Sequence, residues 1–136
     1  MRKRILILIA IILIIGILFT YFKISSLKFN LNSNEIYSIE YSFDCYSNGI
    51  GYIKGEVTDK EILNNTVSYL NKISLLISFT KTKGATQWLG FKDKNGNLIK
   101  GYAFGCGDLW VGNKTYMFGD AQINKVKELL NVNDKK

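Results

Sequence analysis

The chain has 136 residues, a formal net charge of +7 and no histidine. Without histidine, the chain by itself cannot form a Ser-His-Asp or Cys-His catalytic triad or a histidine-ligated zinc site. Three of the excess positive charges belong to Arg2, Lys3 and Arg4, and the remaining lysines form no basic stripe interleaved with aromatic residues, so we expect no nucleic-acid partner.

The first predicted element is a membrane anchor, because residues 5–22 read ILILIAIILIIGILFTYF and carry no charge. At about 1.5 Å per residue, a helix of this length spans roughly 27 Å, close to the ~30 Å hydrocarbon thickness of a bilayer. The basic residues stand before the apolar stretch, so the positive-inside rule places residues 1–4 in the cytoplasm and the chain from residue 23 outside. A cleaved secretory signal is the alternative, but its apolar region usually covers only about 7 to 15 residues. We therefore predict a single-pass signal anchor that contacts the lipid bilayer through residues 5–22.

After the anchor, residues 23–34 are polar and rich in Asn and Ser, and we interpret them as a linker to one extracytoplasmic domain, residues 35–136. That length suffices for one domain with a modest core and is too short for two. The domain opens with EIYSIEYSFDC, where apolar and polar residues alternate at the period of a half-buried strand. Asn48-Gly49 then predicts a hairpin turn, and residues 50–57 return as a second strand whose glycines indicate an edge or a bulge.

Two helices are expected. The first begins at TDKE, where Thr58 three residues before Glu61 forms a capping box. Its apolar residues recur at helical spacing and should face the core: Ile62, Leu63, Val67, Leu70 and Ile73. The second is AQINKVKELL, capped by Asp120, and its apolar face consists of Ile123, Val126, Leu129 and Leu130.

Between the helices, the stretches SLLISFT, ATQWLGFK and LIKGYAF and two short strands within DLWVGNKTYMFG are expected to form a meander. The sequence DKNGN resembles the start of a calcium loop, but its glycine comes too early and no glutamate closes the loop. A hairpin turn at Asn95-Gly96 explains these residues without an ion. The predicted fold is α+β: one N-terminal transmembrane helix, then a mostly antiparallel sheet of about six to seven strands packed with two helices.

These segments together resemble a family. A strand, the helix VTDKEILNNTVSYLNKI, a meander with KDKNGNLI and YMF, and a closing KVKELL are similar to small membrane-anchored or lipoprotein-like domains that Gram-positive bacteria export. The resemblance covers most of residues 35–131 and implies an α+β domain on the outer face of the membrane. It implies no catalytic residues, and we expect no cofactor. The chain lacks the lipid-attachment cysteine of the lipoprotein members.

Two classes of function remain open. The first is a non-catalytic binding module for a protein, a peptide or a cell-wall component, since Trp and Tyr are the usual interface anchors. Its candidate binding residues are Trp88, Tyr102, Trp110 and Tyr116. The same tryptophans are alternatively the largest pieces of the core. The second class is a cell-surface hydrolase or transferase that uses carboxylates, for which Glu40, Asp44 and Asp108 are the candidates near strand ends and turns.

The two cysteines, Cys45 and Cys106, are interpreted as a disulfide. Exported thiols can be oxidised, the chain has no C-x-x-C pair, and it has no histidine to activate a thiolate. Gly105 and Gly107 give the second cysteine a backbone that is free to turn toward its partner. Two buried, unreactive thiols are the alternative, and we expect no metal site.

Overall fold

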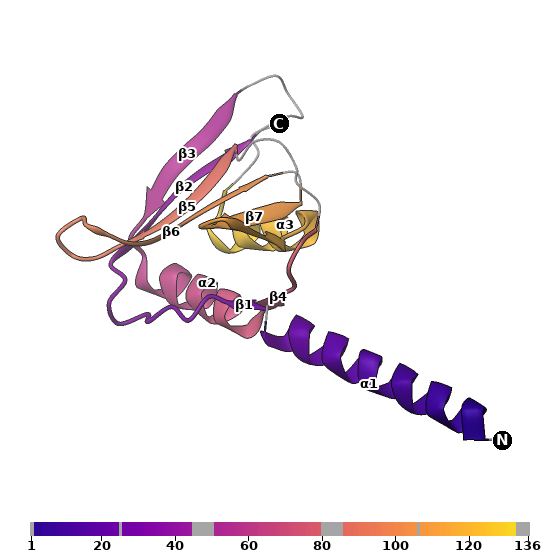
Figure 1. Cartoon of the computed structure of the whole chain (residues 1–136). Coiled ribbons are helices and arrows are strands. Elements are labelled where there is room, and N and C mark those ends of the chain that lie inside the picture. The colour runs from indigo at the N-terminus through magenta and orange to yellow at the C-terminus, as the bar shows by residue number, and fades with distance from the viewer. Residues whose placement is uncertain (1, 25, 45–50, 80–85, 106, 133–136) are drawn as a thin grey trace.

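The computed structural model describes residues 2–24, 26–44, 51–79, 86–105 and 107–132. In chain order, the elements are α1 (Arg2–Ile24), β1 (Leu27–Lys28), β2 (Ser38–Asp44), β3 (Tyr52–Val57), α2 (Lys60–Lys72), β4 (Ser74–Leu75), β5 (Gln87–Lys92), β6 (Leu98–Gly105), β7 (Asp108–Val111), β8 (Lys114–Met117) and α3 (Asp120–Leu129). Figure 1 shows α1 extending away from a domain of sheet and helices. The expected α+β fold class is confirmed.

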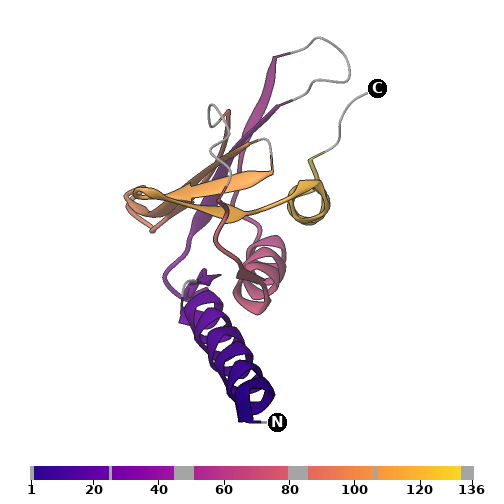
Figure 2. The ribbon, with the colours of Figure 1, turned by 45° about the vertical axis from the view of Figure 1, so that its right-hand side comes forward.

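Six strands form one antiparallel sheet in the order β3-β2-β5-β6-β7-β8, and β1 and β4 form a separate two-stranded sheet. Because β2 lies between β3 and β5 and is antiparallel to both, β3 and β5 run parallel. Parallel strands need a crossover connection, and the connection from β3 to β5 contains the helix α2. Figures 1 and 2 show that α2 and α3 lie on the same face of the sheet, so that within the described residues no helix covers the other face.

The hydrophobic core lies between the sheet and these two helices. Its largest side chains are five phenylalanines, each at most 1 % exposed: Phe29, Phe43, Phe91, Phe104 and Phe118. The rings of Phe104 and Phe118 meet edge to face, with centroids 5.3 Å apart. The helices contribute the apolar stripes expected from their sequences, including Leu63, Val67 and Leu70 of α2 and Ile123 and Val126 of α3.

Both helices begin differently from the prediction. Oδ1 of Asp59 accepts hydrogen bonds from the backbone N–H groups of Glu61 and Ile62, each at 3.0 Å. Asp59 is therefore the N-cap of α2, and the predicted capping box on Thr58 is wrong. Gly119 is the N-cap of α3, so Asp120 is not the cap but lies in the first turn, where a carboxylate is favoured by the helix dipole.

The predicted linker also differs from the structure, because its second half belongs to the domain. Phe29 and Leu31 are buried in the core, and β1 pairs with β4. The Asn71 side chain of α2 binds the backbone of Leu31 twice, accepting from its N–H and donating to its carbonyl oxygen, both at 2.8 Å. Nζ of Lys100 donates to the carbonyl oxygen of Phe29 at 2.9 Å. The alternation of apolar side chains in KFNL thus buries this segment instead of leaving it as a stalk.

Most of the described turns and short strands agree with the predictions from the sequence. β5 and β6 join through the expected turn, in which Gly96 has φ +81° and its N–H donates to the carbonyl oxygen of Asp93 at 3.0 Å. β7 and β8 form the second expected hairpin. In the described part of SLLISFT, residues 74–79, only β4 is a strand, and Ile77 then forms an isolated bridge to Tyr116 of β8. The turn predicted at Asn48-Gly49 lies outside the described residues.

The N-terminal helix α1 is long and apolar enough to cross a membrane between Lys3 and Tyr21. None of these residues is buried against the domain. Their side chains therefore offer an apolar surface that the protein itself does not cover.

Candidate functional site

The two faces of the sheet differ in what covers them. Successive side chains of a strand point to opposite faces, and on β5 the buried Leu89 and Phe91 point toward the helices. Trp88 and Gly90 therefore lie on the opposite side of the sheet. We call this side, which no described helix covers, the open face.

A row of six residues, one from each strand, crosses the open face. Each residue is the register partner of the next: Lys54, Ser42, Trp88, Ala103, Trp110 and Thr115. Trp88 and Trp110 stand two strands apart, so their backbones are separated by roughly 10 Å at the usual strand spacing. Both tryptophans are half-buried, and neither belongs to the core. The structure thus brings two of the four predicted binding residues onto one surface.

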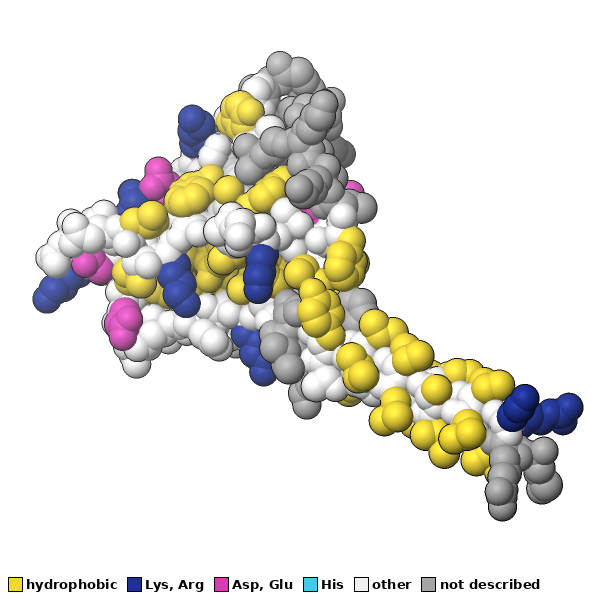
Figure 3. Space-filling view, viewed as in Figure 1, with side chains coloured by type: hydrophobic (Ala, Val, Ile, Leu, Met, Phe, Trp, Pro, Cys, Tyr) yellow, Lys and Arg dark blue, Asp and Glu magenta, His cyan; other side chains and the backbone are white. Residues whose placement is uncertain are grey.

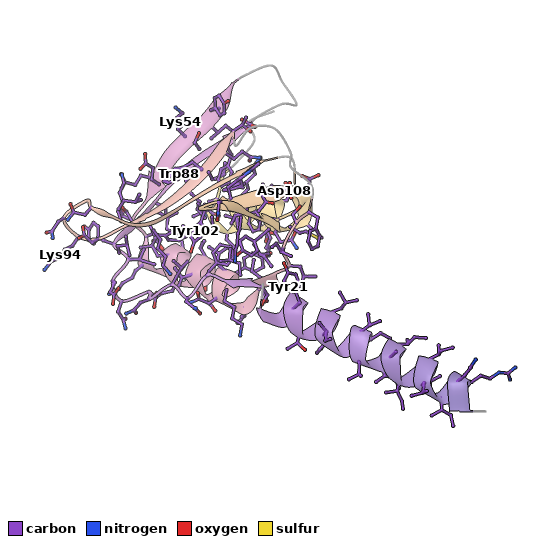
Figure 4. The ribbon with its side chains drawn as sticks, viewed as in Figure 1. Tyr21, Lys54, Trp88, Lys94, Tyr102 and Asp108 are labelled. Carbon is purple, nitrogen blue, oxygen red and sulfur yellow. The ribbon has the colours of Figure 1, made fainter. Side chains whose placement is uncertain are left out.

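The other two candidates, Tyr102 and Tyr116, are buried on the helix side of the sheet. The hydroxyl of Tyr102 donates to the carbonyl oxygen of Phe29 at 3.4 Å, and the two rings meet edge to face at 4.9 Å. Burial raises the pKa of the Tyr102 hydroxyl. Figure 4 shows Tyr102 between the sheet and α2, with Trp88 and Lys54 on the other side of the strands. These tyrosines are core residues and do not share a surface with the tryptophans.

Two glycines set the position of Trp88. Gly90 and Gly101 face each other on β5 and β6, beside the tryptophan. A Cβ atom added to Gly90 would meet Nε1 of the indole at 2.8 Å, and one added to Gly101 would overlap the six-membered ring. The indole therefore lies across both glycines, and their lack of side chains gives it room on the sheet.

Beside Trp88, the open face is hollowed into a shallow groove with a volume of about 590 Å³ across β3, β2 and β5. The side chains that line it, besides the indole, come mainly from the polar positions of β2 and β3: Glu40, Ser42, Lys54 and Glu56. Lys54 also lies over the ring of Tyr52, with Nζ 5.9 Å from the centroid. The groove combines one aromatic surface with a hydroxyl, an ammonium group and two carboxylates.

The two carboxylates of the groove share one lysine. Nζ of Lys92 lies 2.8 Å from Oε2 of Glu40 and 3.7 Å from Oε1 of Glu56, and the hydroxyl of Ser38 donates to Oε1 of Glu56 at 2.6 Å. The hydrogen bond to Glu40 is the main reason that the pKa of Lys92 is raised. Because these groups are near solvent, the network adds little stability, but it fixes two hydrogen-bond acceptors at the rim of the groove.

The three carboxylates predicted for a hydrolase do not come together. Asp44 lies four residues beyond Glu40 on β2, roughly 13 Å along the strand. Asp108 is buried at the start of β7, three strand spacings or roughly 14 Å from β2. Both separations exceed the ~5 to 9.5 Å between the acids of a glycosidase. Asp44 also accepts a hydrogen bond from the hydroxyl of Thr86.

Sequence reasoning missed Ser42, Lys54, Glu56 and Lys92 as parts of one site. A signal was present, because the hairpin of β2 and β3 and the alternation along β5 place these polar residues on the same face as Trp88. The strand order was the missing information. Only the pairing of β2 with β5, which are far apart in the chain, brings the hairpin beside the tryptophan.

Both Cys45 and Cys106 lie outside the described residues, so the disulfide stays a prediction. Their described neighbours, Asp44 on β2 and Gly105 on β6, are on strands that β5 separates. Two strand spacings amount to roughly 10 Å, whereas a disulfide needs Cα atoms about 4.4 to 6.8 Å apart. A bridge therefore requires the chain to converge beyond these strand ends.

A second hollow, of about 670 Å³, lies between residues 33–37 and the turn that joins β5 to β6. One of the two carboxylates that line it, Asp93, is already used by the turn. Oδ1 of Asp93 accepts from the backbone N–H groups of Asn95 and Asn97, each at 2.8 Å. Hydrogen bonds from Asn97 are the main cause that lowers the pKa of Asp93. In the part of the chain that the structure describes, no three His, Cys, Asp or Glu side chains gather as a metal site would require.

Comparison with known proteins adds no relative, since no protein-family model, no curated protein and no solved structure matches the chain. The site therefore has to be interpreted from its own chemistry.

Proposed function

We propose that the protein is a membrane-anchored binding module whose open face holds a saccharide chain of the cell envelope, on the outer side of the membrane. The observation that carries this proposal is the row across the open face, in which two tryptophans stand two strands apart among polar side chains. An elongated ligand that follows this row would contact both indoles.

The outer side is proposed from the charges that flank α1. Lys3 and Arg4 precede its apolar stretch, and the positive-inside rule keeps such residues in the cytoplasm. A single crossing then puts the domain on the outer side. The envelope polymers lie in the same compartment as the domain under this topology.

The chemistry of the groove suits a sugar. The C–H groups of a sugar ring pack against an aromatic surface, and its hydroxyls need both donors and acceptors at the ring edge. Trp88 offers the surface, Lys54 the donor, and Glu40 and Glu56 the acceptors. An extended peptide that adds a strand would use the edge of a sheet and not its face.

The shape of the groove favours a polymer over a small molecule. Small-molecule sites are concave and bury about 70–90 % of the ligand's surface. This groove is shallow and open along the sheet. Figure 3 shows hydrophobic side chains between acidic and basic ones over the upper part of the domain. A chain of sugars can lie across such a surface and gain affinity from several weak contacts.

The proposal is tested with the full chain in lipid nanodiscs and purified peptidoglycan, by measuring how much protein sediments with the polymer. The Trp88→Ala variant should bind at least about tenfold more weakly, since central aromatic anchors of an interface typically contribute more than 1.4 kcal/mol. Lys54→Ala should weaken binding as well, and because Lys54 is exposed this variant leaves the core intact.

The matched control is Tyr37→Ala, which removes an exposed aromatic residue outside the row and should bind like the unchanged protein. Failure of the unchanged protein to sediment with peptidoglycan would overturn the proposal. So would equal binding by Trp88→Ala, Lys54→Ala and Tyr37→Ala. Release of soluble sugar fragments from the polymer would instead support the hydrolase function.

A further inference from the structure

The segment of residues 74–79, which follows α2, exposes two large apolar side chains. We call it the basal segment. Leu76 is 48 % exposed and Phe79 is 69 % exposed. The backbone of this segment is nevertheless held against β8 by two hydrogen bonds. The N–H of Met117 donates to the carbonyl oxygen of Leu76 at 2.9 Å, and the N–H of Ser78 donates to the carbonyl oxygen of Thr115 at 2.9 Å. A fixed backbone that presents apolar side chains outward is typical of an interaction surface.

The basal segment lies close to the end of the membrane helix. Leu75, beside Leu76, is the register partner of Leu27, and Leu27 comes only three residues after Ile24, where α1 ends. Three residues span at most about 10 Å. Figure 3 shows hydrophobic side chains of the domain next to the end of α1, so that the apolar surface of the helix continues onto the domain.

Two lysines lie beside the basal segment. Lys28 is the register partner of Ser74, and Lys72 is the last residue of α2, two positions before the segment begins. Both are exposed. Lysines beside an apolar surface near a membrane are attracted to anionic lipid headgroups.

We infer that the basal segment rests on the bilayer that α1 crosses, with Leu76 and Phe79 in the interfacial layer and Lys28 and Lys72 directed to headgroup phosphates. The interfacial layer of each leaflet is about 5 to 7 Å deep. The three residues from Ile24 to Leu27 span at most about 10 Å, and β4 lies one strand spacing of about 5 Å from β1, so the basal segment is held within roughly 15 Å of the helix end. The partner is the lipid and not a second protein, since the apolar surface continues from a helix of membrane-spanning length. This inference does not depend on the ligand of the open face.

The test is photo-crosslinking of the full chain in vesicles of phosphatidylethanolamine and phosphatidylglycerol. The photoreactive residue p-benzoylphenylalanine replaces Phe79 in one variant and Tyr52 in a second. Tyr52 is also exposed, but it lies on β3 at the end of the domain far from α1 (Figure 1). A third variant carries the photoreactive residue at Ile12, in the middle of α1.

Lipid adducts are expected at positions 12 and 79 and not at position 52. Replacing phosphatidylglycerol by phosphatidylcholine should lower the yield at position 79 several-fold and leave the yield at position 12 unchanged. The inference is overturned if position 79 forms lipid adducts no more often than position 52, or if it crosslinks to a second copy of the chain instead. It is also overturned if position 12 forms no lipid adduct, because α1 then does not hold the domain at a bilayer.

Discussion

The indole of Trp88 occupies the space that a side chain on Gly101 would need, although the two residues belong to different strands. Gly90 leaves the matching space on β5. The orientation of the proposed binding surface therefore depends on two residues that have no side chain. This relationship can be disturbed without touching the tryptophan itself.

Gly101→Ala should displace the indole, because the new Cβ atom would overlap its six-membered ring. We expect a changed tryptophan emission spectrum and weaker sedimentation with peptidoglycan, by about tenfold, as for Trp88→Ala. The free energy of unfolding should fall by about 1–3 kcal/mol from overpacking. Gly51→Ala is the matched control, since a Cβ atom at Gly51 meets nothing within 4 Å. Unchanged emission and binding in Gly101→Ala would contradict the proposed role of the indole.

Phe29→Ala should destabilise the domain strongly, although Phe29 lies in the stretch that the sequence suggested as a linker. Its ring is buried against Tyr102 and Phe118, and removing a buried phenylalanine typically costs about 3–5 kcal/mol. Urea unfolding of the full chain in detergent micelles, followed by near-UV circular dichroism, measures this loss. Lys28→Ala, at the exposed neighbouring position, should change the free energy of unfolding by less than about 0.5 kcal/mol. Equal stability of the two variants would mean that residues 27–31 are not part of the core.

Alkaline pH should destabilise the domain through Tyr102. Burial raises the pKa of its hydroxyl in the folded state, so the unfolded chain loses this proton first. The protonated Tyr102 hydroxyl stabilises the folded state fully at a pH below the unfolded pKa of about 10. This stabilisation is lost as the pH rises from there toward the pKa of the folded state. Tyr102→Phe should therefore show a smaller fall in the urea midpoint between pH 8 and pH 11 than the unchanged protein.

A part of this alkaline fall should remain in Tyr102→Phe, because burial also raises the pKa of Tyr69. Tyr37→Phe, which removes the hydroxyl of an exposed tyrosine outside the core, is the matched control. An identical pH dependence in Tyr102→Phe and Tyr37→Phe would show that Tyr102 does not couple ionisation to folding.

Local patterns in the sequence were sufficient for much of the fold. The helical spacing of Leu63, Val67 and Leu70 predicted the buried face of α2, and Asn95-Gly96 predicted the turn between β5 and β6. The caps were less predictable, because Thr58 and Asp59 are neighbours and both can cap a helix. Their competition is decided by the backbone geometry of the first turn, which a sequence pattern does not contain.

The candidate site was only half predictable. Alternation alone distinguishes Tyr102 from Trp88. Tyr102 is two residues from the buried Phe104 and therefore on the same face of its strand, whereas Trp88 is next to the buried Leu89 and therefore on the opposite face. That signal was available in the sequence and would have separated core from surface. What could not be foreseen is that β2 pairs with β5, since pairing between distant segments depends on packing of the whole sheet. The ion pair between Lys92 and Glu40 depends on this pairing, so the sequence alone did not predict it.

The close succession of α1 and β1 also limits where the protein can act. Only two residues separate Ile24 from Leu27, so the domain has no extended stalk and cannot rise far from the end of its helix. With α1 in a bilayer, the height that the open face can reach is set by the size of the domain itself. The protein would then sample only the thin layer next to the membrane surface, and a polymer in the outer wall would be beyond its range.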